Sequence, residues 1–228
     1  MVGIVDLEVF LKRKIRQYFK VYFDSREQRS LFNKDFVIVS RNCWGSQIYQ
    51  QLNIPYNTPF IGLFFYGPCY MKLLKDFDRY MGVDLNFIPV SKYKDAKNDY
   101  PIGVLDDIEI HFQHYSNEDE ARSKWNRRKK RMLLQQNKNH YFFMICDRRG
   151  VTSEDLTDFH GLPFKNKVSF SINPMLGEKT EEHIILRQQS NDKRTFAVNG
   201  KKLYKLTFLY FDVIQWLNTG KIQRTRFK

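Results

Sequence analysis

A carboxylate and an imidazole stand two residues apart in a segment where apolar and polar side chains alternate. Isoleucine or phenylalanine occupies positions 108, 110 and 112, and Glu109 and His111 fall between them. Successive side chains of a strand point to opposite faces, so the pattern predicts that Glu109 and His111 share one face. With Asp107 at the strand start, they could form an acid–base pair or bind a metal ion. His114 falls on the apolar side unless the strand ends before it, and we keep it as a substrate-binding candidate.

A structural role is the alternative for this polar stripe. A helix expected over residues 117–132 would then cover a hydrogen-bonded row of polar side chains, and no chemistry would follow.

A cysteine lies in the turn after the first expected strand. Cys43 stands between Asn42 and Trp44, just before the start of a helix. That position favours the thiolate and so predicts a lowered thiol pKa. A nucleophilic thiol needs a base, which His111 or His114 would supply. The alternative is that Cys43 is a small buried hydrophobic residue and Trp44 a packing residue.

Polar turns adjoin three of the expected strands. They contain Asn42 with Trp44, Asn57, and Asp147 with Arg148. In open α/β sheets, ligands bind beyond the carboxyl ends of the strands. We therefore expect the two asparagines and the aspartate to bind polar groups of a ligand, and Arg148 to hold a phosphate.

One further arginine is a candidate for holding phosphate. Arg128 lies in a basic run over residues 122–131, near the edge of a helix stripe that Trp125 marks as buried. Its planar guanidinium suits a phosphate or a carboxylate. The alternative is a solvated basic helix. Neither a phosphate-binding glycine loop nor a Gly-x-Gly-x-x-Gly motif is present, so no cofactor follows from the sequence, and we assign no metal ligands.

Strands and helices alternate along the chain, which predicts an α/β fold with a mixed, mostly parallel central sheet and flanking helices. The expected strands cover residues 35–40, 60–65, 85–90, 103–105, 108–115, 141–146, 168–171 and 184–187. The segments 103–105 and 108–115 are either two strands or one bent strand. The expected helices cover residues 47–52, 68–81, 117–132, 153–159 and 211–217.

The first residues form a separate feature. Apolar side chains recur at helical spacing over residues 5–23 with lysines and arginines between them, which predicts an amphipathic basic helix. It either docks on the domain or lies on an anionic membrane. We therefore divide the chain into an N-terminal helix, residues 1–33, and one α/β domain, residues 34–228.

The 228 residues carry a formal net charge of +13. Such an excess attracts nucleic acid, anionic lipid headgroups or phosphorylated substrates. Nucleic acid is disfavoured because the basic residues concentrate on one helix and the tail, without a nucleic-acid-binding motif. No apolar run is long enough to cross a membrane, and no signal peptide is evident. We expect a cytoplasmic protein, either free or peripheral at the inner face of the membrane.

Five stretches together resemble a bacterial family of domains of unknown function whose members are often labelled exopolysaccharide or capsular polysaccharide biosynthesis proteins. They are SRNCWG (40–45), LNIPYNTPFIGL (52–63), YPIGVLDDIEIHFQHY (100–115), WNRR (125–128) and DRRG (147–150). In the last, Arg149 departs from the family's Asp-Arg-Asp-Gly turn. The resemblance implies a cytoplasmic α/β protein associated with polysaccharide assembly, and it carries no catalytic residue over.

Two hypotheses follow. In the first, the protein is a transferase that acts on a sugar nucleotide or a phosphorylated glycan, with His111 or Glu109 as base. In the second, it is a non-catalytic accessory protein that docks to a membrane or a glycosyltransferase through residues 5–23.

Overall fold

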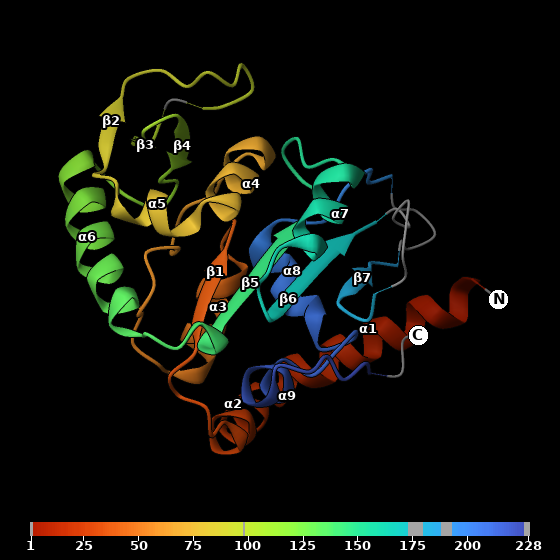
Figure 1. Cartoon of the computed structure of the whole chain (residues 1–228). Helices are drawn as coiled ribbons and strands as arrows, with labels where there is room; N and C mark the ends of the chain where they lie inside the picture. The colour runs from red at the N-terminus through yellow and green to blue at the C-terminus, as the bar shows by residue number, and fades with distance from the viewer. Residues whose placement is uncertain (1, 98, 173–179, 188–192, 226–228) are drawn as a thin grey trace.

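The computed structural model describes residues 2–97, 99–172, 180–187 and 193–225, with side chains from residue 7 onward. Its centre is a four-stranded parallel sheet (Figure 1). The strands are β1 (Val37–Ser40), β5 (Tyr141–Cys146), β6 (Asn166–Ser171) and β7 (His183–Ile185), and they lie side by side in that order. The expected α/β fold with a mostly parallel sheet is confirmed.

Alternate residues of the central strands feed two hydrophobic clusters. In β5, Tyr141, Phe143 and Ile145 face one cluster, while Phe142 and Met144 face the other. A strand buried on both faces reads as the continuous apolar run seen in the sequence. One face is covered by α3 (Trp44–Leu52), α8 (Gly200–Thr207) and α9 (Val213–Thr219). The other is covered by α4 (Gly67–Lys75), α5 (Phe77–Gly82), α6 (Glu118–Leu134) and α7 (Ser153–Gly161).

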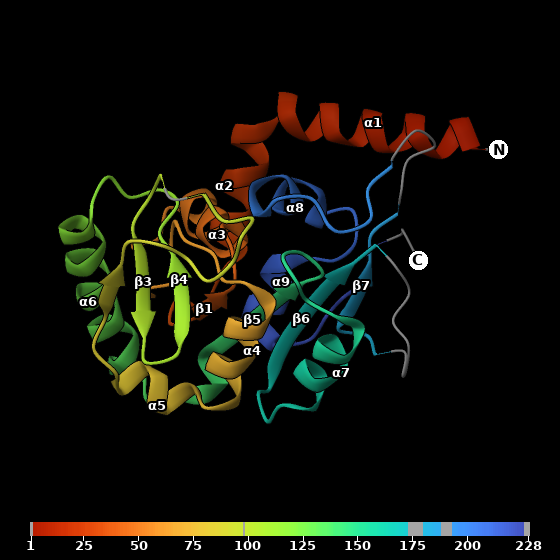
Figure 2. The same cartoon turned by 90° about the horizontal axis from the view of Figure 1, so that it is seen from above.

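A second, antiparallel sheet lies at one side of the first (Figure 2). It consists of β2 (Asn86–Ile88), β3 (Ile102–Leu105) and β4 (Ile108–His111). β3 and β4 form a tight hairpin in which Asp106 takes a positive φ of 57°. Asp is among the residues that tolerate this conformation. A short 3-10 turn, Lys138–His140, precedes β5.

Several sequence expectations for the α/β domain differ from the structure. Residues 60–65 are buried but form only one bridge, from Phe64 to His111, because Gly62 adopts a left-handed φ of 71° that interrupts an extended ladder. β4 ends at His111, so residues 112–115 leave the strand. The helix expected over 68–81 is broken at Asp76, whose φ is −137°. Helix α8 was not expected at all.

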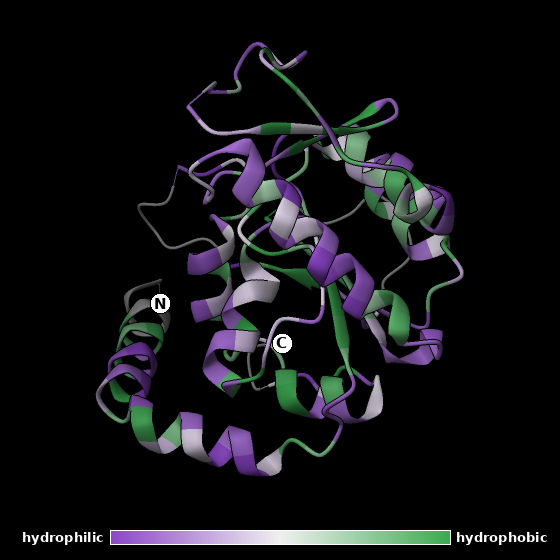
Figure 3. Cartoon of the chain, turned by 90° about the vertical axis from the view of Figure 1, so that its left-hand side faces the viewer, coloured by the Kyte–Doolittle hydropathy of each residue, from purple (hydrophilic) through white to green (hydrophobic). Residues whose placement is uncertain are grey.

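The N-terminal segment forms two helices, α1 (Val2–Tyr18) and α2 (Lys20–Ser30), where one was expected. α1 extends past the β7 side of the molecule, away from the antiparallel sheet (Figure 2). Hydrophobic and hydrophilic residues are interleaved along both helices (Figure 3). Arg16 anchors α1, because its guanidinium lies 2.6 Å from Glu27 of α2 and 4.7 Å from the Phe208 ring.

Candidate functional site

The carboxyl edge of the parallel sheet gathers charged side chains from two neighbouring strands. Arg41 and Asn42 follow β1, and Asp147, Arg148 and Arg149 follow β5. β1 and β5 are adjacent and parallel, so both turns lie at the same edge. The expectation that Asn42 and Asp147 come from one edge of the sheet agrees with this topology.

Arg41 is buried, with 1% of its surface exposed, and has no carboxylate partner in the described ranges. Its guanidinium donates to the carbonyls of Cys146, Arg148 and Phe65, the last two at 2.6 and 3.1 Å. Burial lowers the pKa of this guanidinium, and the nearby Arg149 and Arg148 lower it further. The guanidinium at this edge is therefore hydrogen-bonded to peptide carbonyls and to no carboxylate among the described residues.

Two more arginines stand beside it without an ion pair to any described residue. Arg148 donates to the carbonyl of Ala197 at 2.7 Å and lies over the ring of Phe196. Arg149 lies 3.8 Å from the ring centre of Phe64. Its φ is +50°, an uncommon conformation for a residue other than glycine. Backbone strain of this kind is concentrated at functional sites.

Asp147 supplies the carboxylate of the edge. Its two oxygens accept from the backbone N–H groups of Ile172 at 2.7 Å and Ala197 at 2.6 Å. Burial raises the pKa of this carboxyl, and the two N–H bonds oppose the rise. Asn42 is also engaged: its oxygen accepts from the N–H of Trp44 at 2.9 Å, and its amide points to the sulfur of Cys146 at 3.3 Å.

The structure contradicts the lowered pKa expected for Cys43. The thiol is half-buried, and burial raises its pKa. In the described part of the chain, no histidine nitrogen makes a hydrogen bond to its sulfur. Trp44 is fully buried and donates to the hydroxyl of Thr207 at 2.9 Å, so it packs α3 against α8.

Glu109 and His111 are neighbours on one face of β4, as the alternation predicts. His111 Nε2 lies 3.5 Å from Glu109 Oε2, yet neither ring nitrogen makes a hydrogen bond within the described residues. The ring is 0% exposed and stacks on Phe64 at 4.6 Å. Burial lowers the pKa of His111 to about 4. In this arrangement the imidazole contacts protein atoms only, and its catalytic role stays a prediction.

The cover over this pair differs from the expected one. Tyrosines 66, 93 and 100 surround His111, and the Ser91 hydroxyl and the Lys92 N–H donate to Glu109 at 2.7 and 2.9 Å. The loop before β3 therefore covers Glu109 and His111, where a helix over residues 117–132 was expected to do so. Asp107 lies apart in the exposed hairpin turn, where bonds from Lys72 and Tyr80 lower its pKa to about 2.

The remaining candidates lie away from the edge. Asn57 donates to the carbonyl of Phe36 at 2.9 Å, at the amino end of β1, so the structure does not bring it to Asn42. Arg128 is 8% exposed and donates to the hydroxyl of Tyr115 at 2.7 Å. It therefore does not lie on a solvated face. His114 is exposed after β4.

A polar cavity of about 200 Å³ lies at the carboxyl edge. Its walls come from the end of β5, the start of α7, the end of β6 and the segment before α8. The lining residues are Asp147, Val151, Thr152, Ser153, Leu156, Ser171 and Thr195. One carboxylate and four hydroxyls suit a polyhydroxylated ligand, because each sugar hydroxyl both donates and accepts.

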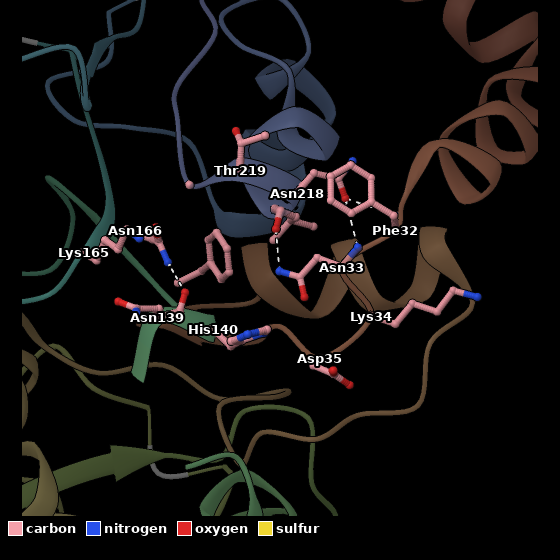
Figure 4. Close-up of a pocket in the computed structure, with 13 residues that line it drawn as sticks. Phe32, Asn33, Lys34, Asp35, Asn139, His140, Lys165, Asn166, Asn218 and Thr219 are labelled. Atoms are coloured by element: carbon pink, nitrogen blue, oxygen red, sulfur yellow. Dashed lines mark hydrogen bonds between the residues drawn. The ribbon is translucent and has the colours of Figure 1, made fainter. Parts of the chain in front are cut away.

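A larger hollow, of about 420 Å³, lies at the amino ends of β1, β5 and β6 (Figure 4). Its side-chain amides already tether protein segments. Asn33 donates to the carbonyl of Leu217 at 2.7 Å, Asn166 donates to that of Asn139 at 2.7 Å, and Asn218 accepts from two backbone N–H groups. These groups have little capacity left for a ligand, and ligands of parallel sheets bind at the other edge.

A chain of hydrogen-bonding side chains runs from the carboxyl-edge cavity beneath α7. It links Ser171, His183, Ser169 and His160, and Glu182 lies 3.4 Å from the second histidine without a hydrogen bond to it. Among the described residues, no group of three or more His, Cys, Asp or Glu could hold a metal ion. No described helix is both long and apolar enough to cross a lipid bilayer.

Residues 14–218 match the domain of unknown function DUF1919. The match spans nearly the whole chain. The chain belongs to the DUF1919 family. An uncharacterized protein of Haemophilus influenzae is 35% identical to this DUF1919 protein over 212 residues, which cover 91% of this chain and 96% of the relative.

The DUF1919 match includes every residue of the carboxyl edge and every member of the hydrogen-bonded row of side chains beneath α7. The serines and histidines beneath α7 are not among the site residues expected from the sequence. A signal for them exists: Ser169 and Ser171 flank Phe170, so a period of two puts both hydroxyls on one face of an otherwise apolar strand. The histidines come from two other elements, and only the fold brings them to that face.

Proposed function

We propose that this DUF1919 protein is a group transferase of surface-polysaccharide synthesis that acts on a sugar nucleotide or a phosphorylated glycan. One observation carries the proposal. The turn over residues 147–152 holds two arginines without an acidic partner among the described residues, and the same turn supplies Asp147, Val151 and Thr152 to the wall of a polar cavity.

The chemistry of the two parts is complementary. The hydroxyl-lined cavity fits the sugar, and the guanidinium groups of Arg148 and Arg149 fit the phosphate with planar, bidentate geometry. The buried Arg41 adds a positive potential that raises the local concentration of an anion. Asp147 accepts hydroxyl hydrogens in addition to its two backbone bonds, since a carboxylate has about four acceptor sites.

Titration calorimetry with a panel of nucleoside diphosphate sugars tests this function. The variant Arg149→Gly removes the guanidinium while glycine accepts the positive φ at this position. Loss of a charge-assisted bond should raise the Kd about 10-fold or more. Arg127→Ala, which removes the same charge from an exposed position on α6, is the matched control and should change the Kd less than about twofold. Equal weakening in both variants, or no saturable binding of any sugar nucleotide, contradicts the proposal.

A second candidate function rests on α1. Leu7, Phe10, Leu11, Ile15 and Tyr18 form one stripe, each between 49% and 84% exposed. Arg16, which contacts α2 and Phe208, faces the body from the other side of the helix. An outward apolar stripe with Lys14 among its side chains and Arg13 beside it suits peripheral docking on an anionic membrane.

A further inference from the structure

Strand β6 carries a buried polar stripe where a parallel strand would ordinarily be apolar. Lys167, Ser169 and Ser171 are 7%, 0% and 2% exposed and face α7, while Val168 and Phe170 belong to the hydrophobic cluster on the other face. Burying hydroxyls and an ammonium is costly unless each is hydrogen-bonded. Departures of this kind from an apolar core are expected at functional sites.

The two serines are joined through two histidines. Ser171 Oγ lies 3.1 Å from Nε2 of His183, and Nδ1 of the same ring lies 2.7 Å from Ser169 Oγ. Ser169 Oγ in turn lies 2.7 Å from Nε2 of His160. The other nitrogen of His160 lies 3.4 Å from Glu182 Oε2, which is an ion-pair distance without hydrogen-bond alignment.

The Glu182 carboxylate, at one end of this row of side chains, determines which group donates in each hydrogen bond. A carboxylate only accepts, so its field favours the tautomer of His160 that has the hydrogen on Nδ1, towards Glu182. Nε2 of His160 then accepts from the hydroxyl of Ser169. Because that hydroxyl has a single hydrogen, Ser169 Oγ must accept from Nδ1 of His183.

This direction leaves the Nε2 lone pair of His183 pointing at the hydroxyl of Ser171. The reverse direction would place a lone pair of His160 against the Glu182 carboxylate, which is repulsive. A hydroxyl that donates to an imidazole held by further bonds is the arrangement of an activated serine nucleophile. Burial lowers the pKa of His183 to about 4, so the ring is neutral near pH 7 and its Nε2 carries a lone pair.

Access and charge stabilisation come from the carboxyl-edge cavity. Ser171 forms part of its wall, so a small acyl group that enters the cavity meets the hydroxyl. Ser153, at the start of α7, lines the same cavity. The N–H groups of the first two residues of a helix have no intrahelical acceptor, so those of Ser153 and Glu154 can stabilise a developing oxyanion.

We propose that Ser171 is a nucleophile, with His183 as its base, that takes an acyl group from a small carboxylic ester in the carboxyl-edge cavity. This deepens the proposed function by making the transferred group an acyl group and the alcohol a sugar hydroxyl. The role of Ser171 itself does not depend on nucleotide-sugar binding.

The reaction balances without a cofactor. Ser171 Oγ bonds to the ester carbonyl carbon as its proton passes to His183 Nε2. The bond from that carbon to the alcohol oxygen then breaks, and His183 returns the proton to the departing oxygen. In the second half, water or another sugar hydroxyl attacks the acyl-serine, gives its proton to His183, and Ser171 leaves with that proton. Ser169 and His160 are positioning residues.

A fluorophosphonate probe and p-nitrophenyl acetate test the proposal on the full chain. We expect peptide mapping of the labelled wild-type protein to place the adduct on Ser171. Ser153 is far more exposed in the same cavity, so labelling governed by access alone would fall on Ser153. An adduct on Ser153, or none at all, overturns the proposal, and this mapping needs no variant.

Variants then test the base. His183→Gln keeps hydrogen-bonding capacity but removes the proton acceptor, and it should slow labelling and ester hydrolysis about 100-fold or more. Thr157→Ala, which removes a hydroxyl from α7 outside the cavity, should label at the wild-type rate. An unchanged rate in a folded His183→Gln protein overturns the proposal. Nucleotide-sugar titration separates the two proposals: labelling of Ser171 without sugar-nucleotide binding contradicts only the proposed function, and binding without labelling contradicts only this inference.

Discussion

At the scale of single residues, the clearest departures from ordinary chemistry are the buried imidazoles. His111 and His183 are both buried, and burial lowers the pKa of each to about 4. A histidine with a depressed pKa takes up a proton more readily in the unfolded chain than in the folded one. The stability contributed by each is therefore complete above the unfolded pKa of about 6.5 and is lost as the pH falls towards 4.

His111→Phe tests this linkage. Phenylalanine has a similar shape, would stack on Phe64, and has no ring nitrogens to leave unbonded. We expect the loss of unfolding free energy between pH 7 and pH 5 to be smaller in the variant by about 1 to 2 kcal/mol. Urea denaturation at both pH values measures it. An equal loss in variant and wild type would mean that His111 is already protonated, or freely solvated, in the folded protein.

At the scale of elements, the caps show how local sequence determines a helix start. Asn117 accepts from the N–H of Glu120, as its place before an acidic first turn predicts. Thr152 and Asp155 form a reciprocal capping box at the start of α7. This second cap also positions the end of α7 that lines the carboxyl-edge cavity.

Removing the α7 cap should be measurable. Thr152→Ala should destabilise the protein by about 1 kcal/mol, because the N–H of Asp155 loses its acceptor. Thr157→Ala makes the same change within α7. The Thr157 hydroxyl bonds back to the Ser153 carbonyl, so this control should be near neutral. Denaturant midpoints compare the two, and equal effects would show that the capping box contributes nothing.

Most elements could be predicted from the sequence because their signals are local. The apolar runs at β1 and β5 and the cap at Asn117 are of this kind. α8 escapes because Asn199-Gly200 is typical of a turn, although Asn199 caps the helix by accepting from the N–H of Lys202. The apolar run over residues 60–65 predicts a strand, but an apolar run does not determine whether the backbone pairs with a neighbouring strand.

The site was only partly predictable for the same reason. The sheet-edge rule places Asn42 and Asp147 at one edge, because it depends only on strand direction. The rule cannot show that Asn57 bonds at the amino end of β1, opposite the edge that carries Asn42. It also cannot show that tyrosines from the loop before β3 enclose His111. The contacts of Ser171 with His183 and of Ser169 with His160 depend on how β7 and α7 pack on β6, which no spacing in the sequence reports.

At the scale of the whole molecule, the outward stripe of α1 predicts where a membrane would lie. We expect the intact chain to co-sediment with vesicles that contain anionic lipid and not with neutral ones, because basic and apolar groups act together. Leu7→Gln with Leu11→Gln should abolish sedimentation without changing stability, since both side chains are exposed.

A matched control for this experiment lies just after α2. Phe32→Gln removes an apolar side chain that is 72% exposed but lies outside the stripe, and it should sediment like wild type. Sedimentation of the double variant with anionic vesicles would show that charge alone directs the binding. No sedimentation of the wild type would refute membrane docking.

The buried Arg41 links segments that are distant in sequence. Its carbonyl accepts from the N–H of Phe65 at 3.0 Å. Its guanidinium donates back to the Phe65 carbonyl and to the carbonyls of Cys146, at the end of β5, and Arg148, in the turn that follows. Next to these hydrogen bonds, Phe64 forms a backbone bridge with His111 of the antiparallel sheet. Arg41 thus couples the parallel sheet to the antiparallel sheet. The two sheets should therefore unfold in a single cooperative transition.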